Sequence, residues 1–265
     1  MVGKIIGIVS LKGGVGKTSI VSALGGALAS LGKKVLLIDG NLSSPNLGLH
    51  FNIVNPEITL HDVLERGARP SEAVYPLPDF DLMPASLFRK LNASPLKLKD
   101  RISYLRRSYD VIVIDSSPAL DEETLGVILA SDGILVVTTP DHPTMANTLR
   151  AVKLAKQRGT PIIGLVLNKV YNKNFELSMA KMEDCLDIPV MAVIPHDLGF
   201  LESLSEFTSY PSFKPKSKAS EEFRKLAALV MGEKYDTPRL RNFFGWIAPE
   251  RQEINRQIYY EEMFK

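Results

Sequence analysis

The stretch SLKGGVGKTS at residues 10–19 carries two lysines in a glycine-rich turn, and both could neutralise phosphate. An apolar run at 5–9 precedes it and a helix-like stretch at 19–31 follows it, which is the strand–loop–helix context of a phosphate-binding loop. Glycines there let backbone N–H groups turn inward around phosphate oxygens, and the start of the helix adds its positive end. We predict that a nucleotide's phosphates are held by Lys12, Gly13, Gly14, Val15, Gly16, Lys17, Thr18 and Ser19.

Four side chains in and near this loop predict a magnesium nucleotide site. The ammonium of Lys17 should reach the β- and γ-phosphates, and the hydroxyl of Thr18 should hold Mg²⁺. Asp39 and Asp115 each end an apolar run, so their carboxylates should project at the carboxyl edge of a sheet. An aspartate in such a place is often only a turn residue. Because two of them accompany a phosphate-binding loop, we assign Thr18, Asp39 and Asp115 to the metal.

The elements that must position these residues alternate along the chain. Short, mostly β-branched runs predict strands buried on both faces of a sheet, and amphipathic stretches between them predict helices. The expected fold is therefore α/β, a doubly wound and mainly parallel sheet with helices on both faces. The expected strands are 5–9, 35–38, 111–114, 134–137, 162–167 and 190–194, and the expected helices are 19–31, 96–107, 144–158, 175–186 and 217–231.

The loop departs from the common GxxxxGK[ST] pattern, because Leu11 stands first and Lys12-Gly13-Gly14 follows. This resembles the deviant P-loop of the MinD/ParA family of ATPases. The segments KVLLIDGNLSSPNLGLHF, YDVIVIDSSPAL, GLVLNKV and VMAVIPHD resemble further parts of that family, in family order over residues 3 to about 230. The similarity is greatest to the MinD-like branch. It implies a P-loop ATPase domain at 1–232, followed by a linker and helical tail at 233–265.

The resemblance implies an ATP-dependent homodimer with Mg²⁺ as cofactor. In the family, the early lysine crosses a face-to-face dimer and contacts the partner's phosphates, so Lys12 would serve the neighbour's nucleotide and Lys17 its own. A charge supplied in trans can neutralise the γ-phosphate as an arginine finger does. Asn168, on the loop expected after the strand at 162–167, should read the adenine edge, because its amide carries both a donor and an acceptor. Pro195 and Asp197 would flank the base by family resemblance.

One position departs from the MinD pattern in a way that bears on hydrolysis. The family usually reads Asp-x-Asp after the second strand, where the second aspartate positions the attacking water, but this chain reads Asp39-Gly40-Asn41. An asparagine can hydrogen-bond a water but cannot accept its proton. The expected enzyme is a slow Mg²⁺-dependent ATP hydrolase with Lys12, Lys17, Asp39 and Asn41 as catalytic residues. A different residue doing the work, or an altered chain, remain alternatives.

The tail contains a candidate membrane helix. Apolar residues recur at i, i+3, i+4 and i+7 with a tryptophan beside them, and arginines lie on other sides, as in helices that lie in a membrane surface. The residues are Leu240, Phe243, Phe244, Trp246 and Ile247. MinD proteins end in such a helix, which implies a cytoplasmic protein peripheral on the inner face of the cell membrane. The alternative is a helix that packs on its own domain or on a partner.

Charge and composition help to decide between the remaining classes of function. Lys plus Arg total 32 against 30 for Asp plus Glu, so a ParA-type ATPase that coats DNA is the less supported alternative. Asn41 keeps a non-hydrolysing nucleotide-binding scaffold open. Because Cys185 is the single cysteine, the sequence argues against the family's classes that use paired cysteines at their dimer interface. No apolar run reaches the roughly 20 residues that cross a bilayer, and we expect no cleavable signal peptide, because a strand pattern starts the sequence. We expect spatial positioning, in cell division or a related process, with an unidentified protein partner.

Overall fold

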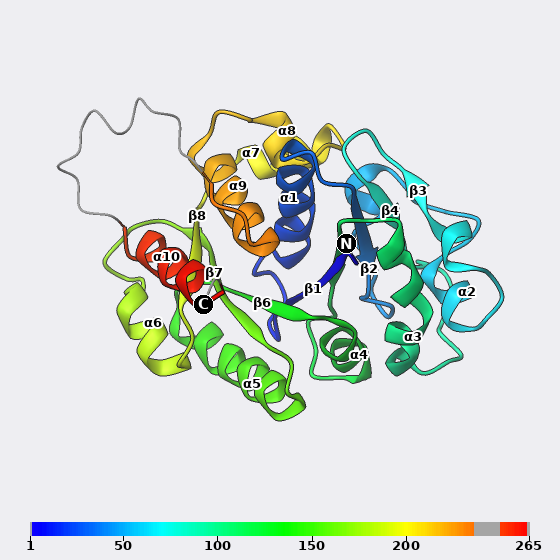
Figure 1. Ribbon diagram of the computed structural model, residues 1–265, viewed down its shortest axis with the longest axis horizontal. Helices are drawn as coiled ribbons and strands as arrows, with labels where there is room; N and C mark the ends of the chain where they lie inside the picture. Colours follow the sequence, from blue (N-terminus) through cyan, green and yellow to red (C-terminus); the bar gives the residue numbers. More distant parts are fainter. Residues whose placement is uncertain (1, 236–249, 264–265) are drawn as a thin grey trace.

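The computed structural model describes residues 2–235 and 250–263, and its centre is a twisted sheet (Figure 1). Within those residues the sheet has eight strands in the order β3-β4-β2-β5-β1-β6-β7-β8. Every neighbouring pair is parallel except β3 and β4, which confirms the doubly wound, mainly parallel fold. The strands are β1 Lys4–Val9, β2 Val35–Asp39, β3 Tyr75–Pro76, β4 Asp81–Met83, β5 Val111–Asp115, β6 Gly133–Thr138, β7 Ile162–Val170 and β8 Val190–Pro195.

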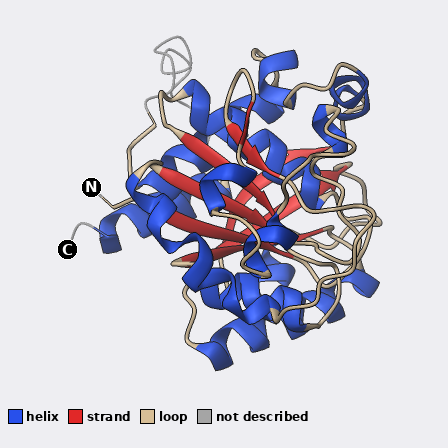
Figure 2. Cartoon of the chain, turned by 90° about the vertical axis from the view of Figure 1, so that its right-hand side faces the viewer, coloured by secondary structure: helices blue, strands red, loops and turns tan. Residues whose placement is uncertain are grey.

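Helices cover both faces of the sheet (Figure 2). Residues of α1, α8 and α9 share one buried cluster with one face, and residues of α2 to α6 pack on the other. The α-helices are α1 Lys17–Ser30, α2 Leu60–Leu64, α3 Leu98–Ile102, α4 Glu122–Ala130, α5 His142–Arg158, α6 Met179–Leu186, α7 Gly199–Ser205, α8 Tyr210–Phe213, α9 Lys218–Met231 and α10 Arg251–Met263. The described residues also form the 3₁₀ turns η1 Leu49–Phe51, η2 Pro70–Ala73, η3 Pro95–Lys97 and η4 Ser103–Arg107.

The single helix expected at 96–107 is interrupted, so the prediction of one continuous helix was wrong. The stretch forms η3, α3 and η4 in succession. Its beginning lies tightly against α4, since a Cβ built on Gly126 would stand 2.6 Å from the carbonyl oxygen of Pro95. We attribute the break to this tertiary packing, which can outweigh helical periodicity.

Helix α10 closes the open edge of the sheet along β8. The side-chain amide of Asn255 donates to the carbonyl oxygen of Val190 at 2.8 Å, and the guanidinium of Arg256 donates to that of Met191 at 2.7 Å. Side chains thus satisfy carbonyl groups that an edge strand otherwise leaves open to another strand. The part of the predicted tail that the structure describes therefore packs on the ATPase domain. No helix among residues 2–235 and 250–263 is both long and apolar enough to traverse a bilayer.

Candidate nucleotide site

The loop between β1 and α1 has the backbone shape that an anion site requires. Gly14 and Gly16 have φ values of +80° and +87°, which favour glycine. A Cβ on Gly16 would also stand 2.4 Å from the Nδ2 atom of Asn168, so a side chain there would clash as well as strain the backbone. Helix α1 has no side-chain cap and no acidic residue in its first turn. Its first N–H groups are therefore positioned to bind an anion.

Lys17 and Thr18 both bond to Asp115. The Nζ atom of Lys17 lies 2.6 Å from Oδ1 of Asp115 and also donates to the carbonyl oxygen of Ser116. The hydroxyl of Thr18 donates to Oδ2 of the same carboxylate at 2.6 Å. Lys17 and Asp115 are buried, so this ion pair is shielded from water. The structure thus brings the predicted phosphate lysine to two of the three predicted metal ligands.

Asp39 is the third predicted metal ligand, and sheet register places it directly across from Asp115. Its carboxylate is fully buried and accepts backbone N–H groups of Asn41, Asn46 and Leu47 at 3.2, 3.0 and 2.9 Å. Burial first, and then repulsion from Asp115, raise the pKa of Asp39 to about 7. A divalent cation would relieve this repulsion, and a hydroxyl with two carboxylates is the oxygen donor set that Mg²⁺ prefers. The residues therefore fit Mg²⁺.

Asn41 lies beside this site with an unsatisfied acceptor. Its side chain is 4% exposed, and its Nδ2 atom donates to the carbonyl oxygen of Ser44 at 2.5 Å. Its Oδ1 atom is buried and has no hydrogen-bond partner among the residues that the structure describes. A buried acceptor of this kind is unfavourable unless a water or a ligand bonds to it. The geometry is thus compatible with the water-positioning role predicted for this residue.

Lys12 points to the start of α5 in this structure. Its Nζ atom lies 2.5 Å from the hydroxyl oxygen of Thr144 and 3.4 Å from Oδ1 of Asp141. Asp141 also caps α5 by accepting the backbone N–H of Thr144 at 2.9 Å. Lys12 and Lys17 therefore have separate partners, and the Lys12–Asp141 pair is partly open to solvent.

Asn168 lies inside β7, whereas the sequence analysis placed it on a loop after the strand. Its Nδ2 atom donates to the carbonyl oxygen of Val15 at 2.7 Å, and Nζ of Lys169 donates to that of Gly14 at 2.8 Å. The strand is longer than expected because its register shifts between Leu167 and Val170, where Lys169 adopts a φ of +56°. Asn168 and Lys169 thus brace the phosphate loop from β7, which is separated from β1 by β6.

Pro195 ends β8, and Asp197 lies in the loop that follows. The Asp197 carboxylate accepts the hydroxyl of Tyr210 at 2.7 Å and the backbone N–H of Gly199 at 2.6 Å. These bonds, the one from Tyr210 above all, hold the pKa of Asp197 below its ordinary value. In this structure the carboxylate therefore orders the loop between β8 and α7.

Glu123 is a site residue that the sequence analysis missed. Its Oε2 atom accepts the backbone N–H groups of Leu42 and Ser43 at 2.9 and 3.3 Å, and so ties the segment after β2 to the first turn of α4. Burial, as the largest cause, raises the pKa of this carboxyl group. No local pattern could have predicted the contact, because the partners lie about 80 residues apart. The predicted membrane residues Leu240, Phe243, Phe244, Trp246 and Ile247 lie outside the described residues.

Comparison with known proteins shows which family the chain resembles. Residues 3–159 match the model of an AAA domain family, and residues 100–231 match that of the NUBPL iron-transfer P-loop NTPases. The chain is 34% identical over 234 residues to an uncharacterized ATP-binding protein of Methanocaldococcus jannaschii, with 87% of this chain and 89% of the relative covered. It is 31% identical over 243 residues to the septum site-determining protein MinD of Thermotoga maritima, with 87% and 89% covered.

A solved structure agrees with these relatives. The septum site-determining protein MinD of Pyrococcus horikoshii OT3, complexed with Mg-ADP, superposes with a TM-score of 0.80 and 33% identity over 86% of this chain and 96% of that one. The phosphate loop, the aspartates that end β2 and β5, and the sheet order thus agree with sequence similarity over most of the length. The chain belongs to the MinD/ParA family of P-loop ATPases.

Proposed function

We propose that this protein is a MinD-like ATPase that binds ATP with Mg²⁺, dimerises in the ATP state and acts in cell division or a related positioning process. The observation that carries the proposal is the convergence of Lys17, Thr18 and Asp115 at the phosphate loop, with Asp39 directly across the sheet. Relatives named as septum site-determining proteins support the biological role, and a Mg-ADP complex of one of them supports the cofactors.

Binding of the nucleotide requires Lys17 to change partners. Its ammonium now neutralises Asp115, and a γ-phosphate would compete for it while Mg²⁺ takes over the Asp115 carboxylate. Thr18 and the two aspartates would hold the ion, which supplies charge neutralisation at the β- and γ-phosphates. The Oδ1 atom of Asn41 would orient the attacking water without accepting its proton. Hydrolysis by the isolated protein should therefore be slow.

Dimerisation is proposed to depend on Lys12. Its present partners, Asp141 and Thr144, hold it with one partly exposed ion pair and one hydrogen bond. Exposed ion pairs contribute only ~0–1 kcal/mol, so the phosphates of a second subunit can compete for this lysine. ATP favours the dimer only through contacts that differ between the two states, and Lys12 supplies one such contact.

Membrane recruitment is proposed to depend on residues 240–247. In the sequence they lie between the end of α9 and α10, and both of these pack on the domain. On one side, the carbonyl oxygen of Glu233 accepts the hydroxyl of Tyr260 at 2.6 Å, and on the other α10 is bonded to β8. If Phe243, Phe244 and Ile247 enter the membrane, full burial of each side chain contributes about 1.5–3 kcal/mol to the free energy of binding. A dimer presents two such segments, and avidity can then increase binding by ~10²–10⁴.

Liposome flotation tests the proposal. With ATP and Mg²⁺, wild-type protein should float with vesicles that contain anionic lipid, and Phe244→Glu should not. Ile258→Glu is the matched control, because Ile258 is an exposed apolar residue on the docked helix α10. Loss of flotation in Ile258→Glu alone would place the membrane contact on α10. ATP-dependent pelleting with DNA, and no flotation, would favour the partition-ATPase alternative.

A further inference from the structure

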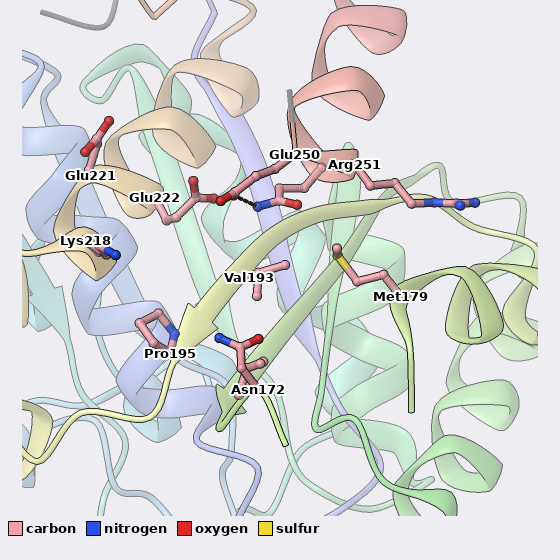
Figure 3. Close-up of a pocket in the computed structure, with 11 residues that line it drawn as sticks. Asn172, Met179, Val193, Pro195, Lys218, Glu221, Glu222, Glu250 and Arg251 are labelled. Atoms are coloured by element: carbon pink, nitrogen blue, oxygen red, sulfur yellow. Dashed lines mark hydrogen bonds between the residues drawn. The ribbon is translucent and has the colours of Figure 1, made fainter. Parts of the chain in front are cut away.

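A cavity of about 620 Å³ lies beside the outer edge strand β8, away from the phosphate loop (Figure 3). It is bounded by β8, by the end of β7 and the loop that follows it, and by the first turns of α6, α9 and α10. Its apolar lining consists of Val170, Met179, Val193 and Pro195. No residue of 10–19 lines it, and its volume is in the range that holds a small organic ligand.

The wall that α10 contributes is fixed in place. Besides its bond to β8, Arg256 donates to Glu222 of α9 at 2.9 Å, and Lys225 of α9 lies 2.6 Å from Glu253 of α10. Arg256 and Lys225 are 5% and 6% exposed, so these ion pairs are shielded from solvent. Their arrangement sets the distance between α9 and α10 and keeps the cavity open.

One buried side chain of this wall has an unmet hydrogen-bonding group. Gln252 lines the cavity and is only 3% exposed. Its Nε2 atom donates to Oε2 of Glu250 at 2.5 Å, whereas its Oε1 atom is buried without a partner among the described residues. Buried acceptors are rarely left unpaired, and a donor group of a ligand would satisfy this one.

The cavity lining also carries hydrogen-bond donors. Figure 3 shows Lys218 on α9 below Glu221 and Glu222, which line the cavity too, and Asn172 beside Pro195. Both side chains are exposed, and neither the Lys218 ammonium nor the Asn172 amide has a partner among the described residues. Arg251 differs, because its guanidinium extends away from the cavity and donates to Glu183. The polar lining thus combines donors on Lys218 and Asn172 with acceptors on Gln252 and on three glutamates, Glu221, Glu222 and Glu250.

We propose that this cavity binds a small zwitterion with an apolar middle, such as an amino acid or an ω-amino acid. Its carboxylate would lie between Lys218 and Asn172, its ammonium would donate to Gln252 and Glu250, and its methylene groups would pack on Val193 and Met179. The charge pattern decides the class, because a ligand with only one charged end would leave one set of polar groups unmatched. The cavity shares Pro195 with the expected adenine site, whereas none of the residues assigned to the phosphates or the metal lines it.

Calorimetric titration with γ-aminobutyrate and ε-aminocaproate tests this proposal on the full chain. At least one of these two probes should bind. Caproate and hexylamine each lack one of the two charges, and each should bind at least about tenfold more weakly than the better zwitterion, because a hydrogen bond to a charged group is lost. Mg-ADP should leave the affinity unchanged. Absence of binding by both zwitterions, equal binding of the singly charged probes, or displacement by Mg-ADP would each overturn the proposal.

Variants separate this cavity from binding elsewhere on the surface. Lys218→Met and Gln252→Leu remove one polar end each, and either should raise the Kd of the better probe about tenfold or more. Arg251→Met is the matched control, since Arg251 borders the cavity but directs its charge elsewhere, and it should bind like wild type. Lys218 is exposed, so its replacement leaves the core intact even if Gln252→Leu fails to fold. Wild-type affinity in Lys218→Met would refute the assignment.

Discussion

Replacing Asp141 by asparagine should strengthen the ATP-dependent dimer. The carboxylate holds Lys12 at 3.4 Å at the start of α5, and the proposed dimer needs that lysine for the partner's phosphates. Asparagine caps a helix as well as aspartate does, so Asp141→Asn should keep the cap on Thr144 while it removes the charge. The two side chains are 37% and 41% exposed, and such pairs contribute about 0.2–1 kcal/mol. A dimer frees two of them, which predicts a dissociation constant about 2- to 30-fold lower.

Light scattering after size exclusion, over a range of protein concentrations with ATP and Mg²⁺, measures this constant. The control is Asp187→Asn, which removes a more exposed pair with Lys156, near the far end of α5. Asp187 has a φ of +53°, a conformation that asparagine tolerates, so this control should fold normally and dimerise like wild type. A dimer that is weaker in Asp141→Asn than in the control would refute the idea that Asp141 competes for Lys12.

Two further substitutions test the water site and the docked helix. Asn41→Asp restores a carboxylate that can accept a proton, so phosphate release should be faster and the ATP dimer shorter-lived; unchanged or slower release would show that Asn41 does not position the water. Arg256→Met removes one member of a buried ion-pair network and leaves a carbonyl group of β8 unpaired. The free energy of unfolding, measured by urea denaturation, should therefore fall by roughly 3 kcal/mol. If it falls by less than in Lys156→Met, which removes an exposed ion pair, α10 is not docked as described.

The sheet and the phosphate site were largely predictable because their signals are local. Buried parallel strands are apolar on both faces, and the glycines with Lys17 and Thr18 occupy one continuous loop. The short strands β3 and β4 were not predicted, because β3 has two residues, one of them a proline, and β4 has three, which is too few to show a period. Asn168 was assigned to a loop because a shift in the pairing of β7 extends the strand beyond its apolar run.

The docking of α10 could not be predicted from its composition. The residues that attach it to β8 are Asn255 and Arg256, which in a sequence are typical of a solvated helix face. They are needed because β8 is an edge strand, which is a property of the assembled sheet. The contacts of Lys12 with Asp141 and of Glu123 with Leu42 likewise join segments more than 80 residues apart. Such contacts follow from the fold and leave no local pattern.

Sedimentation velocity of wild type and Lys12→Ala, each with ATP and Mg²⁺ at equal nucleotide saturation, tests the central claim most directly. Wild type should sediment as a dimer with ATP and largely as a monomer with ADP. Lys12→Ala should bind ATP yet remain monomeric, because Lys17 still holds its own nucleotide while the contact with the partner's phosphates is lost. Equal dimer content in the two proteins with ATP would contradict the assignment of Lys12 to the neighbouring subunit.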